Sequence, residues 1–259
     1  MKENPMTAQN TAEFVGKFAL VTGGTTGIGR ATAELLHAAG ARLAITGQNP
    51  DSLAAAAREL PSDVLVLRSD ARSLADATEL AAQIGQRFGK LDVLFLNAGI
   101  AQLAPFEAVD EAFYQEHMDV NVKGVVFTLQ KLLPLLAQGS SVIVNTSVAD
   151  QRGAPGLSIY SASKGAVAAL VRTLAVELAP RGVRVNSVCP ATILTPIQQK
   201  FGLPPDVAQA VAQKYTARIP LGRFGAAAEV ARAVLFLASP SASYVTGTEL
   251  VVDGGLAIT

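Results

Sequence analysis

The chain has 259 residues, of which 50% are hydrophobic and 16% are charged, and its formal net charge is zero. This length and composition predict one globular domain with a sheet buried on both faces, and the balanced charge does not favour nucleic acid or an anionic membrane as a partner. No apolar run reaches the roughly 18 residues of a membrane-spanning helix, and the single cysteine, Cys189, excludes an internal disulfide, so we expect a soluble, cytoplasmic protein.

The first segment, residues 1–15, is polar and lacks the apolar stretch of a secretory signal. We expect a flexible tail there, followed by a single domain over residues 16–259. The two histidines, His37 and His117, are far apart and do not have the spacing of a metal site. We therefore predict that no metal is bound.

Seven short aliphatic runs alternate with longer segments whose apolar residues recur every three or four positions. The predicted strands are residues 18–22, 42–46, 64–67, 92–96, 141–145, 183–188 and 249–252. The predicted helices are residues 28–40, 50–60, 74–88, 107–136, 161–179 and 227–238, and Gly40, Gly89 and Gly182 stand where glycine commonly ends a helix. This alternation is typical of an α/β fold in which a doubly wound, seven-stranded parallel sheet forms the middle of a three-layer sandwich. The long irregular segment 191–225 is expected to contain a lid, because long loops in compact domains are usually functional.

A glycine-rich turn follows the first predicted strand, in the stretch Thr22–Gly29. Glycines at positions 23, 27 and 29 allow a tight turn and the close approach of a diphosphate to the start of the next helix. The spacing differs from the G-x-G-x-x-G dinucleotide pattern. Alone, the turn is equally well explained as a structural feature.

Polar or turn-forming residues also follow several later strands. They are Asp70, the run Asn97 to Gly99, the pair Thr146 and Ser147, and Pro190 with Thr195 beyond it. Ligands of open α/β sheets bind at the carboxyl ends of the strands. Each residue alone is explained by a loop that starts after a strand, but their combination indicates a binding site.

Tyr160 and Lys164 are separated by one helical turn within a stretch of small residues, SIYSASKGA. Residues at i and i+4 share one face of a helix, so the ammonium can act on the phenol. A phenol needs about three pH units of pKa shift to exchange a proton near neutrality, and a cation about 4 Å away supplies roughly that much. An isolated pair of this kind is more often an ordinary surface contact.

Taken together, these motifs resemble the short-chain dehydrogenase/reductase family, in particular its compact branch of glucose dehydrogenases and 3-oxoacyl-carrier-protein reductases. The resemblance runs from about Lys17 to the end of the chain. It rests on six motifs in the family's order. They are T-G-x-x-x-G-I-G (Thr22 to Gly29), N-A-G (Asn97 to Gly99), Asn121 in DVNVKG, Ser147, Y-x-x-x-K (Tyr160 and Lys164), and VNSVCPATILTP, with VDGG near the C-terminus. The family's fold is a Rossmann-type three-layer sandwich.

The resemblance implies a catalytic tetrad of Asn121, Ser147, Tyr160 and Lys164. Tyr160 would be the general acid in carbonyl reduction and the general base in alcohol oxidation. Lys164 would lower the pKa of Tyr160 and bind the ribose of the nicotinamide nucleoside. Ser147 would bind the substrate oxygen together with Tyr160, and Asn121 would hold a water that links Lys164 to solvent. The local alternatives are a helix residue bonded to its own backbone for Asn121 and a turn former for Ser147.

The resemblance further assigns the binding of a dinucleotide to the glycine turn, the strand ends and the residues after the sixth strand. The assigned residues are Gly23, Thr25, Thr26, Gly27, Ile28, Gly29, Gln48, Asp70, Ala71, Asn97, Ala98, Gly99, Tyr160, Lys164, Pro190, Ile193 and Thr195. At the end of the second strand, Gly47 stands where users of NAD carry an acid, and Gln48 stands where many users of NADP carry arginine. Nothing repels a 2′-phosphate and no cation binds it, so NADP(H) is favoured and NAD(H) is the alternative.

The substrate side of the site is less specific. Loops 100–106 and 148–157 and a lid around residues 197–203 are expected to line it. Their apolar residues, Ile100, Leu103, Val148, Leu157 and Phe201, favour an apolar ketone or alcohol, whereas Gln102, Gln151 and Gln198 offer hydrogen bonds to a more polar one.

Three alternatives to a ketone reductase or alcohol dehydrogenase remain at this point. They are a 3-oxoacyl-carrier-protein reductase, an enoyl reductase and a non-catalytic sensor that binds a dinucleotide. The complete tetrad argues against a sensor, and the four-residue spacing of Tyr160 and Lys164 argues against an enoyl reductase. Members of the family that this sequence resembles are usually tetramers, so we predict a homotetramer. The predicted helices 107–136 and 161–179 agree with this, because each carries more than one apolar stripe and needs cover on more than one side.

Overall fold

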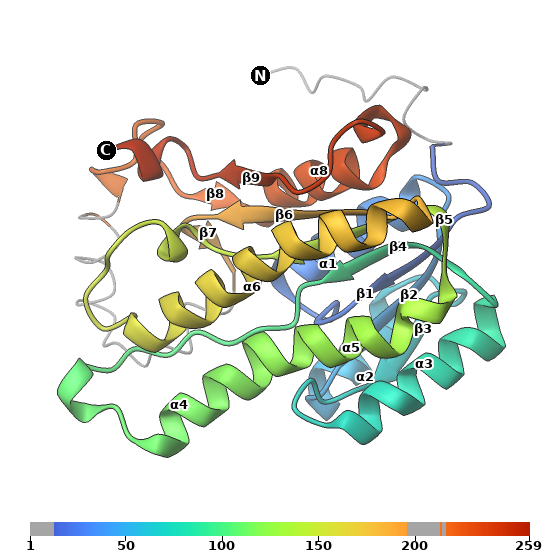
Figure 1. The fold of residues 1–259 in the computed structure, drawn as a ribbon, viewed down its shortest axis with the longest axis horizontal. Helices are drawn as coiled ribbons and strands as arrows, with labels where there is room; N and C mark the ends of the chain where they lie inside the picture. Colours follow the sequence, from blue (N-terminus) through green and yellow to red (C-terminus); the bar gives the residue numbers. More distant parts are fainter. Residues whose placement is uncertain (1–12, 196–212, 214–215) are drawn as a thin grey trace.

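The structure, a computed structural model, describes residues 13–195, 213 and 216–259 (Figure 1). Most of the predicted tail, residues 1–12, lies outside the described residues. So does the predicted lid at 197–203, with Gln198 and Phe201.

A single large sheet forms the centre of the fold, and all seven of its strands are parallel. Its spatial order is β3-β2-β1-β4-β5-β6-β9. The strands are β1 (Phe18–Val21), β2 (Arg42–Gly47), β3 (Leu65–Arg68), β4 (Leu91–Leu96), β5 (Leu136–Asn145), β6 (Arg184–Pro190) and β9 (Glu249–Val252). The predicted seven-stranded, doubly wound parallel sheet is therefore confirmed. The order reverses between β1 and β4, which are neighbours although two strands separate them in the chain.

Helices cover both faces of the sheet (Figure 1). They are α1 (Gly27–Ala38), α2 (Pro50–Glu59), α3 (Leu74–Phe88), α4 (Glu111–Met118), α5 (Gly124–Leu132), α6 (Ser158–Leu178) and α8 (Ala227–Ala238). One apolar core lies between the sheet and α1, α2 and α8, and a second lies between the sheet and α3, α5 and α6. β4 is buried along its whole length and is apolar on both faces except at Asp92, which pairs with Lys17 at the start of the strand.

Capping side chains define where several helices begin. Asn49, Ser73 and Asp110 each accept a hydrogen bond from a backbone N–H in the first turn of α2, α3 and α4. At the other end, Gly89 ends α3 with a φ of +72°, a left-handed conformation that glycine adopts without a steric penalty. These local signals account for the agreement between predicted and observed bounds at 74–88.

The predicted helix 107–136 is wrong as a continuous element. It consists of α4, a π-helical turn at Asp119–Lys123, α5 and a 3₁₀ turn at Leu133–Leu135. Pro134 lies in that last turn, where it ends regular α-helix because it has no backbone N–H to donate. The chain then enters β5 at Leu136, earlier than the predicted start at residue 141.

A second, two-stranded parallel sheet lies inside the segment that the sequence predicted to be irregular. β7 (Ile193–Leu194) pairs with β8 (Gly225–Ala226), directly before α8. The segment 191–225 therefore begins and ends at the same place in the fold, close to the carboxyl end of β6. Within the described residues, no helix has both the length and the apolar character that crossing a membrane requires.

Candidate active site

A large cavity opens at the carboxyl ends of the central strands, beside the point where the strand order reverses between β1 and β4. Its volume is about 1240 Å³. Residues from the ends of β1, β2, β4, β5 and β6 line it, including Gly23, Gln48, Asn97, Ser147 and Pro190. This is the position at which open α/β sheets bind their ligands.

The glycine turn between β1 and α1 needs glycine for two different reasons. Gly23 and Gly27 have φ angles of +61° and +58°, which other residues rarely adopt. Gly29 has no such angle, but a Cβ there would lie 2.2 Å from the Gly23 carbonyl oxygen and 2.5 Å from Asn97 Nδ2. Gly29 therefore allows α1 to pack closely against the strand ends.

Asn97 and Thr22 fix this turn to the end of β4. Asn97 Nδ2 donates to the carbonyl oxygens of Thr22 and Gly23 at 3.1 and 3.0 Å. Thr22 Oγ1 in turn accepts from the backbone N–H groups of Asn97 and Ala98 at 2.9 and 3.1 Å. The turn is thus held in one shape before any ligand binds.

The beginning of α1 is suited to an anion. Its first turn contains no acidic residue, and the side chain of Thr26 makes no capping hydrogen bond. Thr26, Gly27 and Ile28 line the cavity, and the first N–H groups of a helix attract negative charge. At Gly23 a Cβ would lie 2.9 Å from the Cα of Ala98, so the lack of a side chain keeps this cradle open. The residues present fit the diphosphate of a dinucleotide.

All residues predicted to bind the dinucleotide lie on the cavity wall except Gly29. They come from the glycine turn, the ends of β2 and β3, the end of β4, α6 and the segment after β6. Gly29 serves the packing of α1, as described above. The structure thus brings the predicted set together around one cavity.

Tyr160 and Lys164 lie on the first turns of α6, beside the ends of β4 and β5. Lys164 is buried and its Nζ donates to the carbonyl oxygen of Asn145 at 2.7 Å. The same Nζ is 5.8 Å from the centre of the Tyr160 ring. A Cβ on Gly99 would lie 3.5 Å from Nζ, so this glycine leaves room for the ammonium group between β4 and α6.

Burial controls the ionisation of this pair. It raises the pKa of the Tyr160 phenol above its usual value, and a hydrogen bond with Ser147 acts in the opposite direction. It lowers the pKa of the Lys164 ammonium to about 8, while the charge of Asp150 acts against this change. The sequence predicted that Lys164 lowers the pKa of Tyr160. In the protein alone, burial outweighs any such effect, and the phenol keeps its proton at neutral pH.

Asn121 lies in the π-helical turn between α4 and α5 and is buried. Its Oδ1 accepts from Ile100 N at 2.9 Å, and its Nδ2 donates to Ile100 O and to Ser163 Oγ, both at 3.0 Å. These contacts join the loop after β4 to α6. The alternative in which Asn121 bonds to its own helix is therefore wrong, and Asn121 lies behind the cavity wall rather than on it.

Ser147 follows β5 and begins the short 3₁₀ helix η5 (Val148–Asp150), where its Oγ accepts from Ala149 N at 3.2 Å. It also forms the hydrogen bond with Tyr160 noted above. The two interpretations of Ser147 are thus compatible, because one hydroxyl both caps a turn and faces the phenol.

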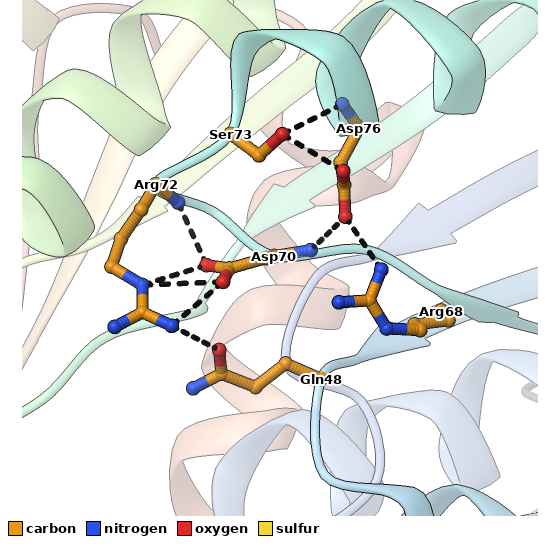
Figure 2. Close-up of polar contacts among 6 residues, drawn as sticks. All are labelled: Gln48, Arg68, Asp70, Arg72, Ser73 and Asp76. Atoms are coloured by element: carbon orange, nitrogen blue, oxygen red, sulfur yellow. Dashed lines mark hydrogen bonds and ion pairs between the residues drawn. The ribbon is translucent and has the colours of Figure 1, made fainter.

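Gln48 follows the end of β2, and a charged residue that no sequence motif indicated lies beside it. Arg72, in the loop after β3, directs Nη2 at Gln48 Oε1, 3.4 Å away, and pairs with both carboxylate oxygens of Asp70 (Figure 2). This pairing holds the pKa of Asp70 below its usual value. Arg68, by contrast, directs its guanidinium at Asp76, with 3.0 Å between Nη1 and Oδ2 (Figure 2). The sequence indicated no cation at this position, and the structure places the Arg72 guanidinium beside Gln48.

Gly47 is also constrained in a way that the sequence did not show. A Cβ at this position would lie 2.7 Å from Thr25 Cγ2. The side chain of Thr25 thus occupies the space in which an acidic residue at position 47 would begin. An acid that discriminates against a 2′-phosphate does not fit there unless Thr25 moves.

The far end of the cavity is largely apolar, as the sequence predicted. Ile100, Leu103, Val148 and Leu157 line it. Gln102 and Gln151 do not, because their side-chain amides donate to Glu116 and Glu249.

Two arginines on the wall were not foreseen. Arg152 and Arg218 both line the cavity. Arg152 Nη1 donates to the carbonyl oxygen of Leu256, which itself lies on the wall. The presence of two cations on the cavity wall is a feature that only the folded arrangement reveals.

Comparisons with known proteins agree with this arrangement. A sequence-family model described as "Enoyl-(Acyl carrier protein) reductase" matches residues 23–257. A 3-oxoacyl-[acyl-carrier-protein] reductase of Thermotoga maritima is 40% identical over 94% of this chain and 98% of its own length. Glucose 1-dehydrogenase of Gluconobacter oxydans is 38% identical over 98% of this chain and 96% of its own.

Solved structures give the same result. A short-chain dehydrogenase/reductase from Brucella melitensis superposes with a TM-score of 0.88 at 36% identity, covering 95% of this chain and 98% of that one. Levodione reductase superposes with a TM-score of 0.89 at 32% identity, covering 95% and 99%.

Proposed function

Because this chain belongs to the short-chain dehydrogenase/reductase family, we propose that Tyr160 is the general acid and base of its reaction. The protein is an NAD(P)-dependent oxidoreductase that acts on alcohols and ketones. The observation that carries the proposal is the meeting of Tyr160, Ser147 and Lys164 at one cavity beside the reversal of strand order. Their roles follow from this geometry.

In carbonyl reduction, the Tyr160 hydroxyl donates its proton to the substrate oxygen while negative charge develops there. Ser147 Oγ donates a hydrogen bond to the same oxygen and holds it in place. The raised pKa of Tyr160 supports the donor role, because it keeps the phenol protonated at neutral pH. The bound dinucleotide supplies or accepts the hydride.

Lys164 and Asn121 support this chemistry from behind. Lys164 Nζ, anchored on Asn145 O, presents its remaining protons towards the cavity for a ribose hydroxyl. Asn121 joins the loop after β4 to α6 and so fixes the distance between the two walls. In this proposal Asn121 acts through the position of α6.

We propose NADP(H) as the preferred dinucleotide and NAD(H) as the weaker one. Position 47 carries no acid, and Thr25 occupies the space that one would need. Arg72 stands beside Gln48 and carries a charge that suits a 2′-phosphate. Asp70 neutralises part of that charge but also fixes the orientation of the guanidinium.

A second candidate, a 3-oxoacyl-carrier-protein reductase, is favoured by one observation. Arg152 and Arg218 place two cations at the substrate end of the cavity, which suits a substrate that carries an anionic group. The apolar wall favours a neutral ketone instead.

We further propose that the protein is a cytoplasmic homotetramer. The single buried cysteine is in line with the location, and the exposed apolar residues considered below are in line with the assembly.

A panel assay tests the proposal. Neutral cyclic ketones, 3-oxoacyl thioesters, sugars and the matching alcohols are each supplied with NADPH, NADH or their oxidised forms, and the absorbance of the reduced nicotinamide is followed. We expect turnover of a ketone with NADPH preferred. Binding of the dinucleotide with no turnover on any substrate would support the sensor alternative and contradict the proposal.

A further inference from the structure

Two carboxyl groups from distant parts of the sequence meet behind the active site. Asp150 ends η5, three residues after Ser147, and Glu249 begins β9. One oxygen of each, together with the sulfur of Cys189, lies within 4.8 Å of the others. None of the three residues lies on the cavity wall, so the cluster is a layer behind it.

The oxygens of Asp150 are in an unusual state for a carboxylate. Both are buried, and neither has a hydrogen-bond partner among the described residues. Burying an ionised carboxylate without a donor is strongly unfavourable. Glu249, by contrast, accepts from Gln151 Nε2 at 2.9 Å. A proton shared between the two carboxyls would give Asp150 the hydrogen bond that it otherwise lacks.

The hydroxyl of Thr146 also contacts this cluster. Its Oγ1 lies 3.0 Å from the carbonyl oxygen of Val188 and 2.6 Å from Glu249 Oε1. Glu249 therefore has the side chains of Thr146 and Gln151 beside its carboxyl oxygens, whereas the oxygens of Asp150 have no such neighbour in the described part of the chain. Burial and the neighbouring Glu249 raise the pKa of Asp150 to about 7.

The cluster is also adjacent to the catalytic helix. The Cβ of Asp150 lies 4.0 Å from the position that a Cβ would take on Gly165, the residue after Lys164. The titratable groups that face Asp150 are Lys164 and Tyr160 from α6, Cys189 from β6 and Glu249 from β9. The charge of Asp150 therefore acts on both ionisable members of the proposed catalytic set.

We propose that Asp150 and Glu249 form a carboxyl pair that holds one proton, and that the charge of this pair sets the pH range in which Tyr160 exchanges its proton with the substrate. The inference rests on the proposed function of Tyr160. Asp150 is a positioning residue here, because it acts through Tyr160 and Lys164 and does not touch the substrate. At neutral pH and above, the pair loses its shared proton and a second negative charge develops beside α6.

The sign of the effect follows from electrostatics. A negative charge near Tyr160 and Lys164 favours their protonated forms, so the doubly charged pair raises both pKa values. Asp150→Asn keeps the shape of the side chain but removes one charge. It should therefore shift the pH profile of alcohol oxidation towards lower pH by about one unit, the scale on which a nearby charge changes a pKa. The profile of ketone reduction should shift in the same direction.

The experiment compares pH profiles of kcat/KM in both directions for the wild type and four variants, Asp150→Asn among them. Glu249→Gln removes the other charge and should shift the profile as Asp150→Asn does, and the double variant should shift it further. Asp150→Glu keeps the carboxyl group and should keep the wild-type profile. A loss of rate that is equal at every pH, with no shift, would mean that Asp150 is only structural and would overturn the proposal.

Two further readouts do not depend on turnover. Infrared spectroscopy should show the C=O band of a protonated carboxyl that titrates near pH 7 in the wild type and is lost in Asp150→Asn. If this band is present while no substrate is turned over, the proposed function fails but the carboxyl pair stands. If the band is absent, the pair does not hold a proton and the inference is wrong.

A chelator gives a control for the kinetic experiment. If the pH profile of kcat/KM of the wild type changes when a chelator is added, a metal cation, instead of a proton, joins the two groups.

Thermal unfolding gives the second readout. The folded pKa of Asp150, about 7, is above the value near 3.9 expected in the unfolded chain. Stability from this group is therefore fully present below about pH 4 and is lost as pH rises through 7. Between pH 5 and pH 8, the Tm of Asp150→Asn should rise relative to that of the wild type. An unchanged difference between the two proteins would contradict the raised pKa.

Discussion

Two features of Tyr160 predict the effect of removing its hydroxyl group on turnover. Its side chain is half-buried on the cavity wall, and its hydroxyl faces Ser147. Tyr160→Phe keeps the ring and removes only the transferable proton. We expect kcat to fall by a factor of about 10² or more, the usual contribution of general acid–base catalysis, with dinucleotide affinity nearly unchanged. Steady-state kinetics and a fluorescence titration of the reduced cofactor measure the two quantities, and wild-type turnover in the variant would remove Tyr160 from its role.

The two arginines near β3 offer a matched pair for testing the cofactor preference. Arg72 contacts Gln48 and Asp70, whereas Arg68 contacts Asp76 (Figure 2). We expect Arg72→Gln to weaken NADPH binding about tenfold or more, since a charge-assisted hydrogen bond contributes about 1.5–3 kcal/mol, and to leave NADH binding nearly unchanged. Arg68→Gln should change neither.

Two fragments of the dinucleotide separate the contribution of the 2′-phosphate from that of the rest of the adenosine. Adenosine 2′,5′-bisphosphate and AMP differ only in the 2′-phosphate, and calorimetry gives their affinities directly. Equal losses for both fragments in Arg72→Gln would mean that the arginine contacts the adenine ring and not the phosphate. A wild type that binds NADH more tightly than NADPH would contradict the proposed preference itself. Gln48→Arg adds a second cation at the same place and should strengthen NADPH binding further.

At the scale of elements, the turn from β1 into α1 is the most constrained connection in the site. A Cβ on Gly29 meets backbone at 2.2 Å, whereas one on Gly85, also within a helix, meets only Leu135 side-chain atoms at 3.5 Å or more. Gly85→Ala should stabilise the protein by about 0.5–1 kcal/mol, because alanine favours helix. Gly29→Ala should destabilise it and abolish dinucleotide binding. Denaturant unfolding and cofactor titration separate the two, and a Gly29→Ala protein with normal binding would show that the turn tolerates displacement.

Elements with strong local signals were predictable, and those decided by distant contacts were not. The bounds of α3 and α8 follow from the sequence, because Ser73 and Gly89 mark the ends of α3 and apolar spacing marks both helices. The π-helical turn around Asn121 has no such signal. It depends on hydrogen bonds that Asn121 makes to Ile100 and Ser163, and these residues are far away in the chain.

The same distinction applies to the site. The glycine turn and the Y-x-x-x-K pair are local patterns, so their residues could be assigned in advance. Arg72 is 24 positions from Gln48, and Asp150 is far from Glu249 in the chain. Only the pairing of the strands brings each pair together, and a single sequence carries no record of that pairing. The cluster of Asp150, Glu249 and Cys189 could therefore not be predicted from the sequence.

At the scale of the whole molecule, exposed apolar side chains on α6, α8 and β9 support the proposed tetramer. On α6, Val176 is 75% exposed. β9 is an edge strand of the sheet, and Val251 on it is partly exposed, as is Phe236 on α8. Edge strands and apolar patches of this kind are usually covered by a partner.

Light scattering coupled to gel filtration tests this prediction. We expect about four times the chain mass of 26.8 kDa. Val176→Asp and Val251→Asp should each reduce the mass to that of a dimer, because each places a charge in one of the two interfaces. Leu74→Asp, an exposed leucine at the start of α3, is the control and should leave the mass unchanged. A mass of one chain for the wild type would rule the tetramer out.

The contact between Arg152 and the carbonyl oxygen of Leu256 has a practical consequence for handling the protein. Leu256 lies on the wall of the cavity, and the hydroxyl of Thr259 lies within hydrogen-bond distance of the carbonyl oxygens of Leu256 and Arg218. An affinity tag fused after Thr259 would therefore start beside the substrate end of the cavity. A tag at the N-terminus leaves the Thr259 end of the chain unmodified. Recombinant enzyme for any substrate screen should carry its tag at the N-terminus.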